Sequence, residues 1–279
     1  MNSLIRQNAN SISSFQELIG EFERIVSGWN ERWGGLRLRC YFRGADKAEY
    51  SLNPGLLRDV FLSEDMEGVE DSIRYDFETR GRPYIPEFIN TAWDKMFFMQ
   101  HHGFPTRLLD WTESLSVALY FSCRDINELG DGCIWVMASS YLVEKKFGVH
   151  RSQVHPDFPG IEEYSLIDGR RDLKKFNEFP PLPIMPFYVS PRITAQIGRF
   201  TVHTFRENQL EEMADQDRNN NGYMCFLHQI IIPSEKKTIL RRQSRLFGGA
   251  SEETLFPDID GLSRGMMWEY SEQYKRKNS

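Results

Sequence analysis

Residues 99–114 bring an unusual number of polar groups together with large apolar ones. The stretch reads MQHHGFPTRLLDWTES, and its histidines, arginine and aspartate could donate protons, accept them or hold an anion. The apolar face of the helix expected just before it, extended by three or four residues, reaches Gln100 and His101. Polar groups on a buried face cost free energy unless something pairs with them. We therefore expect this segment to form the rim of a ligand pocket.

A second candidate group lies at the end of an expected strand over residues 36–44. Apolar side chains alternate there with Arg37, Arg39 and Arg43, which predicts a half-buried strand with its arginines opposite the core. Gly44 ends the pattern, so Arg43 becomes the last side chain on the polar face. An arginine in this place can hold a phosphate with two hydrogen bonds, or it can simply pair with Asp46.

The elements that would position these groups follow from periodicity and capping signals. A capping box at Ser14 opens an amphipathic helix, and a second helix is expected from Glu87 to about His101. A buried helix is expected over 114–123, strands over 131–139 and 224–233, strand and loop over 187–204, and helices over 234–247 and 257–274. Residues 45–86 look rich in loops, 140–183 look like a surface insertion, and 213–222 look like a turn or disorder. These elements predict a single α+β domain.

Composition and absent motifs exclude several classes of protein. The 279 residues include 34 basic and 40 acidic ones, a formal net charge of −6, which argues against broad nucleic-acid binding. The four cysteines are scattered, so we expect a reducing compartment and no metal. With no signal-like or membrane-spanning apolar segment, we expect a soluble cytoplasmic protein without membrane contact. The phosphate-loop, dinucleotide-fold, zinc-peptidase and serine-hydrolase motifs are all missing.

The stretches YFRGADKAEYSLNPGLLR and QHHGFPTRLLDWTESLSVALYFS resemble the FRG domain family, named for its Phe-Arg-Gly. RITAQIGRF (192–200) and LFPDIDGL (255–262) also resemble this family. The resemblance covers residues 12–265, preceded by an N-terminus (1–11) expected to be disordered and followed by a helix end and basic tail (266–279). It implies occurrence in bacteria and phages and little about biochemistry.

A weaker resemblance links the chain to ADP-ribosyltransferases of the arginine–serine–glutamate type. Arg43-Gly44 is similar to their first motif, Thr106 or Thr112 with the helix after it to their second, and the segment from Glu253 to Pro257 to their third. The resemblance implies mixed or antiparallel sheets flanked by helices, with NAD as the substrate. It also implies that Glu253 stabilises an oxocarbenium-like state, that Arg43 binds and that Thr112 positions. The expected substrate-binding residues are Gly44, Tyr50, Gln100, His101, Thr106, Arg107, Asp110, Trp111 and Ser114.

Three functional hypotheses follow. The first is ADP-ribosyl transfer or NAD glycohydrolysis, compatible with a bacterial toxin or phage-defence effector, with the acceptor left open. The second is a non-catalytic sensor that binds a nucleotide-like ligand, and the third is metal-assisted hydrolysis by His101, Asp110 and His203. Simpler structural roles also stay open: an ion pair between Arg107 and Asp110, a core position for Trp111, and a charge pair of Glu252 and Glu253 at the edge of a helix or strand.

Overall fold

One seven-stranded sheet organises the computed structural model, which describes residues 3–34, 39–58, 61–125, 130–165, 172–187 and 191–277. Within these ranges the strand order is β1-β7-β4-β2-β3-β6-β5. All neighbours pair antiparallel except β1, which runs parallel to β7. The strands are β1 (Asn10–Ser11), β2 (Cys40–Ala45), β3 (Leu108–Thr112), β4 (Gly132–Ala138), β5 (Leu182–Ile184), β6 (Gly198–Val202) and β7 (Leu227–Ile232). The expected mixed α and β architecture is confirmed, with one open sheet where several were expected.

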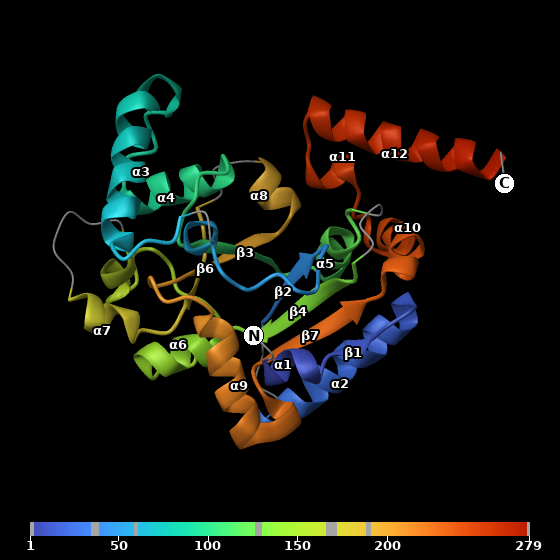
Figure 1. Ribbon diagram of the computed structural model, residues 1–279, viewed down its shortest axis with the longest axis horizontal. Helices are drawn as coiled ribbons and strands as arrows, with labels where there is room; N and C mark the ends of the chain where they lie inside the picture. The colour runs from blue at the N-terminus through green and yellow to red at the C-terminus, as the bar shows by residue number, and fades with distance from the viewer. Residues whose placement is uncertain are drawn as a thin grey trace.

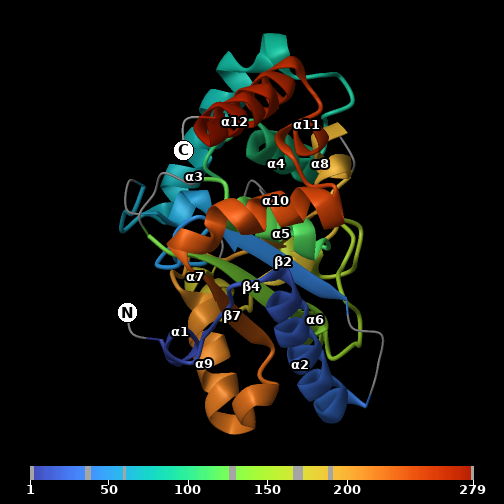
Figure 2. The ribbon, with the colours of Figure 1, turned by 90° about the vertical axis from the view of Figure 1, so that its right-hand side faces the viewer.

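Helices cover both faces of this sheet (Figure 1). They are α1 (Leu4–Gln7), α2 (Phe15–Trp33), α3 (Met66–Arg80), α4 (Ala92–His101), α5 (Leu115–Ser122), α6 (Ser140–Phe147), α7 (Leu173–Asn177), α8 (Pro191–Ala195), α9 (Gln209–Asn221), α10 (Lys237–Gly248), α11 (Glu252–Leu255) and α12 (Ile259–Lys277). Short 3₁₀ turns occupy Gly55–Leu57, Arg82–Tyr84, Ile161–Tyr164, Gly222–Met224 and Ser234–Lys236. Helices α5 and α10 lie side by side over the sheet (Figure 2), joined by a hydrogen bond from Ser244 Oγ to the carbonyl of Ser116. No helix in these ranges is long and apolar enough to cross a lipid bilayer.

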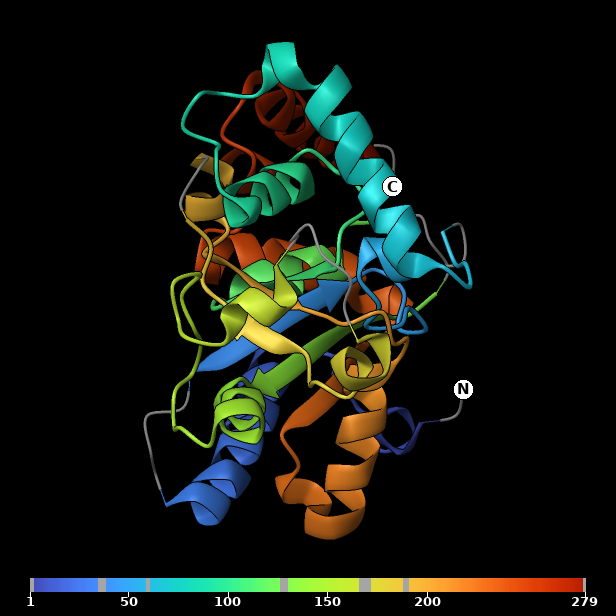
Figure 3. The ribbon, with the colours of Figure 1, turned by 90° about the vertical axis from the view of Figure 1, so that its left-hand side faces the viewer.

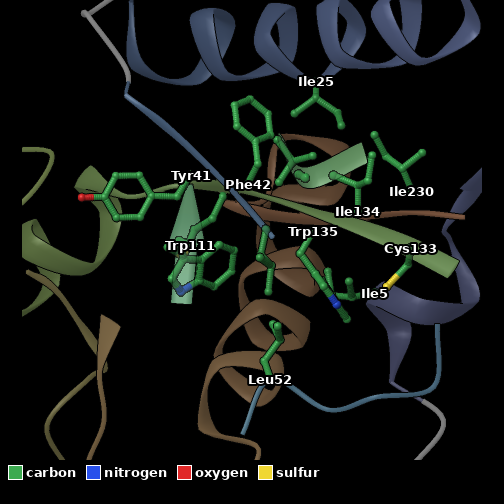
Figure 4. Packing of buried hydrophobic residues seen from close by; sticks show 14 of the residues in the cluster. Ile5, Ile25, Tyr41, Phe42, Leu52, Trp111, Cys133, Ile134, Trp135 and Ile230 are labelled. Atoms are coloured by element: carbon green, nitrogen blue, oxygen red, sulfur yellow. The ribbon is translucent and has the colours of Figure 1, made fainter. Parts of the chain in front are cut away.

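Two hydrophobic cores share the sheet. The larger core packs α2 and α9 against the central strands, and Figure 4 shows Ile25 and Leu52 on opposite sides of the strands that carry Phe42 and Ile134. The smaller core lies toward the β6–β5 edge, where Met96 and other apolar side chains of α4 pack with those of the strands. Figure 3 shows the ribbon from this side of the molecule. Two cores on one sheet allow a cavity to form between the groups of helices that cover them.

The helices and strands with clear local signals are confirmed. Ser14 Oγ accepts a hydrogen bond from the Glu17 amide at the start of α2, as its capping box predicts. The expected strands over 131–139 and 224–233 are β4 and β7, and the buried helix is α5. The helix expected from Glu87 begins later, at Ala92, because Thr91 and Asp94 form the capping box there.

Three segments expected to be loops or disordered are instead ordered structure. Residues 3–11 form α1 and β1, with Ile5 fully buried. Helix α3 lies in the region expected to be loop-rich. The sequence pattern does not show this helix, because the charged Glu70 interrupts its apolar face. Helix α9 runs through 213–221 despite the polar composition of this stretch. Its buried Asp217 carboxylate accepts a hydrogen bond from the Phe226 amide, which ties the helix to the protein.

The expected surface insertion at 140–183 contributes to the smaller core. Val154, Ile161, Tyr164, Phe176 and Leu182 are all buried in it. Strand β2 also differs from its prediction, because Tyr41 and Phe42 are both buried and helices therefore cover both faces of the strand. Residues 35–38 of that prediction lie outside the described residues. The last helix, expected over 257–274, is confirmed as α12, which continues to Lys277 in the basic tail.

Candidate functional site

A cavity of about 770 Å³ opens where β2 and β3 separate, beside the ends of α4 and α5. Helix α8 and the segment that joins α11 to α12 also contribute lining residues. Its lining residues are Phe42, Arg43, Gly44, Gln100, His101, His102, Gly103, Asp110, Trp111, Thr112, Val117, Phe121, Pro191, Arg192, Gln196, Pro257 and Asp258. This volume lies within the usual range for small-molecule sites, about 300–1,000 Å³. The segment expected to form a pocket rim therefore does line a cavity.

Gly44 allows the α5 wall of this cavity to approach β2. A Cβ at Gly44 would lie 1.9 Å from the carbonyl oxygen of Ala118 in α5, closer than real Cβ contacts come. Helix α5 brings Val117 and Phe121 to the cavity. The glycine is therefore explained by packing, and the structure gives it no direct contact role.

Arg43 reaches across the gap between β2 and β3. The two strands pair only at Phe42 and Thr112, and beyond that point Arg43 Nη1 donates a hydrogen bond of 2.7 Å to the Asp110 carbonyl. Strand β2 continues to Ala45, one residue beyond its expected end at Gly44. Burial lowers the pKa of Arg43, an effect that the nearby Asp110 opposes. Its partner is thus Asp110 and not the expected Asp46.

A second guanidinium, that of Arg192 in α8, faces the same cavity. Its Cζ lies 4.7 Å from the centre of the Phe256 ring, a cation–π distance. Partial burial lowers the pKa of Arg192, while the carboxylates of Asp110 and Asp258 raise it. Among the described residues, no hydrogen bond or ion pair engages this guanidinium. Arg192 therefore has its donors available within the cavity.

The polar side chain of Gln100, at the end of α4, has hydrogen-bond partners on both of its amide atoms. Thr106 Oγ1 donates to Gln100 Oε1 at 2.5 Å, and Gln100 Nε2 donates to Asp110 Oδ2 at 2.9 Å. Thr106 in turn accepts a bond from the Leu108 amide. The polar helix end is thus paired through an ordered chain that finishes at a cavity carboxylate.

The histidines beside Gln100 occupy the cavity rim. The rings of His101 and His102 lie 4.9 Å apart in an edge-to-face arrangement. Burial lowers the pKa of His101, and the neighbouring His102 and Arg192 lower it further. His101 is therefore neutral at pH 7, when its ring can both donate and accept a hydrogen bond.

The polar side-chain atoms of Trp111 and Thr112 are bonded to neighbouring residues of the protein. Trp111 Nε1 donates to Thr201 Oγ1 at 3.0 Å, and Thr201 Oγ1 is 2.9 Å from His203 Nε2. Thr112 Oγ1 donates to the Gln196 carbonyl at 2.7 Å. Both residues line the cavity, but their polar atoms are engaged in holding β3 to β6 and to the turn after α8.

Other candidate residues lie outside the cavity lining. Arg107 is fully buried and pairs with Glu70 at 2.7 Å, so the expected ion pair with Asp110 is wrong. Thr106 acts only through Gln100, and Ser114 caps α5. Tyr50 is 49% exposed elsewhere on the surface.

Glu253 differs most from its prediction. It lies in the short helix α11, not on a strand, because Ser251 and Thr254 form a capping box that starts a helical turn. Its carboxylate accepts from Ser251 Oγ and lies 3.7 Å from Arg245, in a small hollow separate from the main cavity. From this C-terminal segment, only Pro257 and Asp258 reach the main cavity. The two carboxylates that line it are therefore those of Asp110 and Asp258.

Glu252 is the buried member of the Glu252–Glu253 pair. Its carboxylate lies 3.1 Å from Arg264 and 3.7 Å from both Arg124 and Arg241. Burial works to raise the pKa of Glu252, but its interactions with Tyr120, Arg264 and Arg124 lower it overall. This ion cluster anchors α11 and α12 beside the cavity, with Glu252 and Glu253 both in the first turn of α11, which agrees with the expected charge pair at a helix edge.

Of the residues proposed for metal-assisted hydrolysis, His101 and Asp110 line the same cavity, but His203 is not among its lining residues. His203 is buried behind Trp111, and burial lowers its pKa to about 3, so it stays neutral. Within the part of the chain that the structure describes, no three histidine, cysteine, aspartate or glutamate side chains could hold a metal ion.

Sequence reasoning missed Arg192, Gln196, Pro257 and Asp258 as cavity residues. All four fall in RITAQIGRF and LFPDIDGL, the two late stretches already noted for their resemblance to the FRG family. A signal for these residues was therefore present, but nothing local showed that the two stretches meet.

Comparisons with known proteins support part of this interpretation. No curated protein and no solved structure matches the chain, and nothing found supports the ADP-ribosyltransferase resemblance. Residues 38–130, which supply β2, β3, α4 and α5 to the cavity, match the family model of the FRG domain and so support the FRG family for this chain.

Proposed function

We propose that the cavity binds a small, phosphate-bearing, nucleotide-like molecule. The observation that carries this proposal is the pair of guanidinium groups, Arg43 and Arg192, that face one cavity from different walls. A planar guanidinium matches the geometry of phosphate oxygens, and a bound anion would offset the unfavourable burial of both charges. The net charge of −6 favours a small anion over a nucleic-acid polymer.

Aromatic side chains give the cavity a second kind of surface. Phe42, Trp111 and Phe121 come to it from β2, β3 and α5. Apolar walls with a few polar groups are typical of sites that take planar organic ligands. This combination supports a nucleotide over inorganic phosphate alone.

Replacing either Arg43 or Arg192 with methionine tests the proposal. Methionine keeps an unbranched apolar stem and removes the charge, so each change is expected to weaken binding of adenosine 5′-diphosphate about 10- to 100-fold. Isothermal titration calorimetry measures the affinities. Arg80→Met is the matched control, because Arg80 is an exposed side chain of α3 away from the cavity lining. Wild-type affinity in both cavity variants would refute the proposal.

NAD-using chemistry is a second candidate, favoured by one observation. Arg43, Gly44 and Thr112 line the same cavity as Asp258, which comes from the C-terminal segment where the resemblance places the catalytic acid. In this reaction the bond between nicotinamide and ribose breaks, nicotinamide leaves with the electron pair, and water or an acceptor adds to the ribosyl cation. A carboxylate facing the cation would stabilise it more than the ground state.

Release of nicotinamide from NAD tests this second candidate. We expect release by the wild type, a loss of about 100-fold in Asp258→Asn, where the charge facing the cation is removed, and no loss in Glu253→Gln. Asparagine can still accept the bond that Asp258 accepts from the Gly261 amide, so α12 keeps its cap. A wild-type protein that releases no nicotinamide rules out the NAD reaction and leaves the binding proposal untouched.

A further inference from the structure

We infer that Asp110 recognises the ribose hydroxyls of the ligand, so that the cavity selects ribonucleotides over their deoxy counterparts. This inference rests on the proposed function, because it assumes a phosphate held by Arg43. The inference narrows the ligand to ribonucleotides, whereas a cavity with two arginines alone would accept many anions.

The hydrogen bonds around Asp110 have a fixed direction. An ionised carboxylate only accepts, so Gln100 turns its nitrogen toward Asp110 Oδ2 and its oxygen toward Thr106. The Thr106 hydroxyl donates to that oxygen and accepts a bond from the Leu108 amide, which holds the Gln100 side chain in place. The chain holds the carboxylate in one orientation without protonating it.

The other carboxylate oxygen, Oδ1, is left for a ligand. Among the described residues, no hydrogen bond engages it, and Asp110 is exposed where it lines the cavity. An ionised carboxylate only accepts hydrogen bonds, so its partner must be a donor such as a hydroxyl or an amine. A phosphate oxygen cannot serve, because like charges repel.

Geometry favours the sugar as that donor. The guanidinium of Arg43 lies 2.7 Å from the backbone oxygen of Asp110, so a phosphate on Arg43 sits beside this residue. In a nucleoside 5′-phosphate the ribose comes next to the phosphate, and the base lies beyond it. The hydroxyls are therefore the nearest donors that the ligand can offer to Asp110.

The negative charge of Asp110 also acts against ligands that lack hydroxyls. It lies close enough to both Arg43 and Arg192 to oppose the lowering of their pKa values by burial. A bare phosphate meets this repulsion without compensation, whereas a ribonucleotide gains a charge-assisted hydrogen bond. Selectivity built from one attractive and one repulsive element is common in specific sites.

Calorimetric titration of the full chain with four probes tests the inference. The probes are adenosine 5′-diphosphate, its 2′,3′-dideoxy form, inosine 5′-diphosphate and pyrophosphate. The wild type is expected to bind the ribose form at least about 10-fold more tightly than the dideoxy form, because the latter cannot make the charge-assisted hydrogen bond to Asp110. Asp110→Asn is expected to bind pyrophosphate more tightly than the wild type and to lose the preference for ribose.

Two further variants separate the hydrogen bond from the charge. Asp258→Asn removes the other cavity carboxylate, so it should tighten pyrophosphate binding and keep the ribose preference. Thr106→Val keeps the side-chain shape, frees the Gln100 amide to turn and should reduce the preference without changing the cavity charge. A purely structural role for Asp110 would instead weaken all four probes together in Asp110→Asn.

The possible failures can be told apart. Equal wild-type affinity for the ribose and dideoxy forms would overturn the inference and leave the proposed function standing. Weak binding of the inosine form, with the dideoxy form bound normally, would assign Asp110 to the base amine and also overturn it. If none of the four probes binds, the proposed function itself fails and the inference fails with it.

Discussion

Replacing Arg107 with methionine is expected to lower the free energy of unfolding by about 3–5 kcal/mol. Arg107 is fully buried, and its guanidinium donates to Glu70 at 2.7 Å, to the His203 carbonyl at 2.6 Å and to the Tyr164 carbonyl at 2.8 Å. One side chain thus ties α3, β3, the end of β6 and the Ile161–Tyr164 turn together. Without it, the Glu70 charge and two carbonyls would be buried without partners.

Urea denaturation followed by circular dichroism measures this loss. The double variant Arg107→Met with Glu70→Met should be more stable than Arg107→Met alone, because it removes the uncompensated charge along with the cation. Arg80→Met in α3 is the control and should change stability by less than about 0.5 kcal/mol. A loss below about 1 kcal/mol in Arg107→Met would show that the buried network is not what holds these elements together.

The ion-pair partner of Arg107 was predicted wrongly from sequence spacing. Arg107 and Asp110 are three residues apart, a spacing that would bring them together on a helix but sends them to opposite faces of a strand. The stretch runs into β3, so Asp110 turns to the cavity and Arg107 to the interior. The partner of Arg107 is Glu70 of α3. This glutamate also interrupts the apolar pattern by which α3 could have been predicted.

Part of the cavity could be predicted because one of its walls is built from a single continuous segment of the chain. Residues 99–114 supply the end of α4 and the whole of β3, and the chain length between them leaves little choice of position. Arg192 and Asp258 come from α8 and the start of α12 and meet this wall only through tertiary packing. The resemblance to ADP-ribosyltransferases placed Glu253 on a strand, whereas a capping box at Ser251 starts a helical turn there. Local patterns thus predict elements, and the far wall of the site depends on contacts between distant segments.

Gly44→Ala is expected to destabilise the protein by about 3 kcal/mol, at the upper end of the usual range for overpacking. The added Cβ would meet three backbone atoms of α5: the Ala118 oxygen at 1.9 Å, the Ser122 nitrogen at 2.7 Å and the Ala118 carbonyl carbon at 2.8 Å. No side-chain rotation can relieve contacts between backbone atoms. Helix α5 must therefore move away from β2, at the place where the two pack against each other.

Gly20→Ala in α2 is the matched control, because a Cβ there meets nothing within 4 Å. Alanine favours a helix interior over glycine, so this change should stabilise the protein by about 0.5–1 kcal/mol. Thermal unfolding and titration with adenosine 5′-diphosphate should be measured on both variants. Because α5 carries Val117 and Phe121 to the cavity beside Arg43, its displacement in Gly44→Ala should weaken nucleotide binding together with stability. A variant as stable as the wild type would mean that the close approach of α5 to β2 is not needed, and the packing explanation of Gly44 would be wrong.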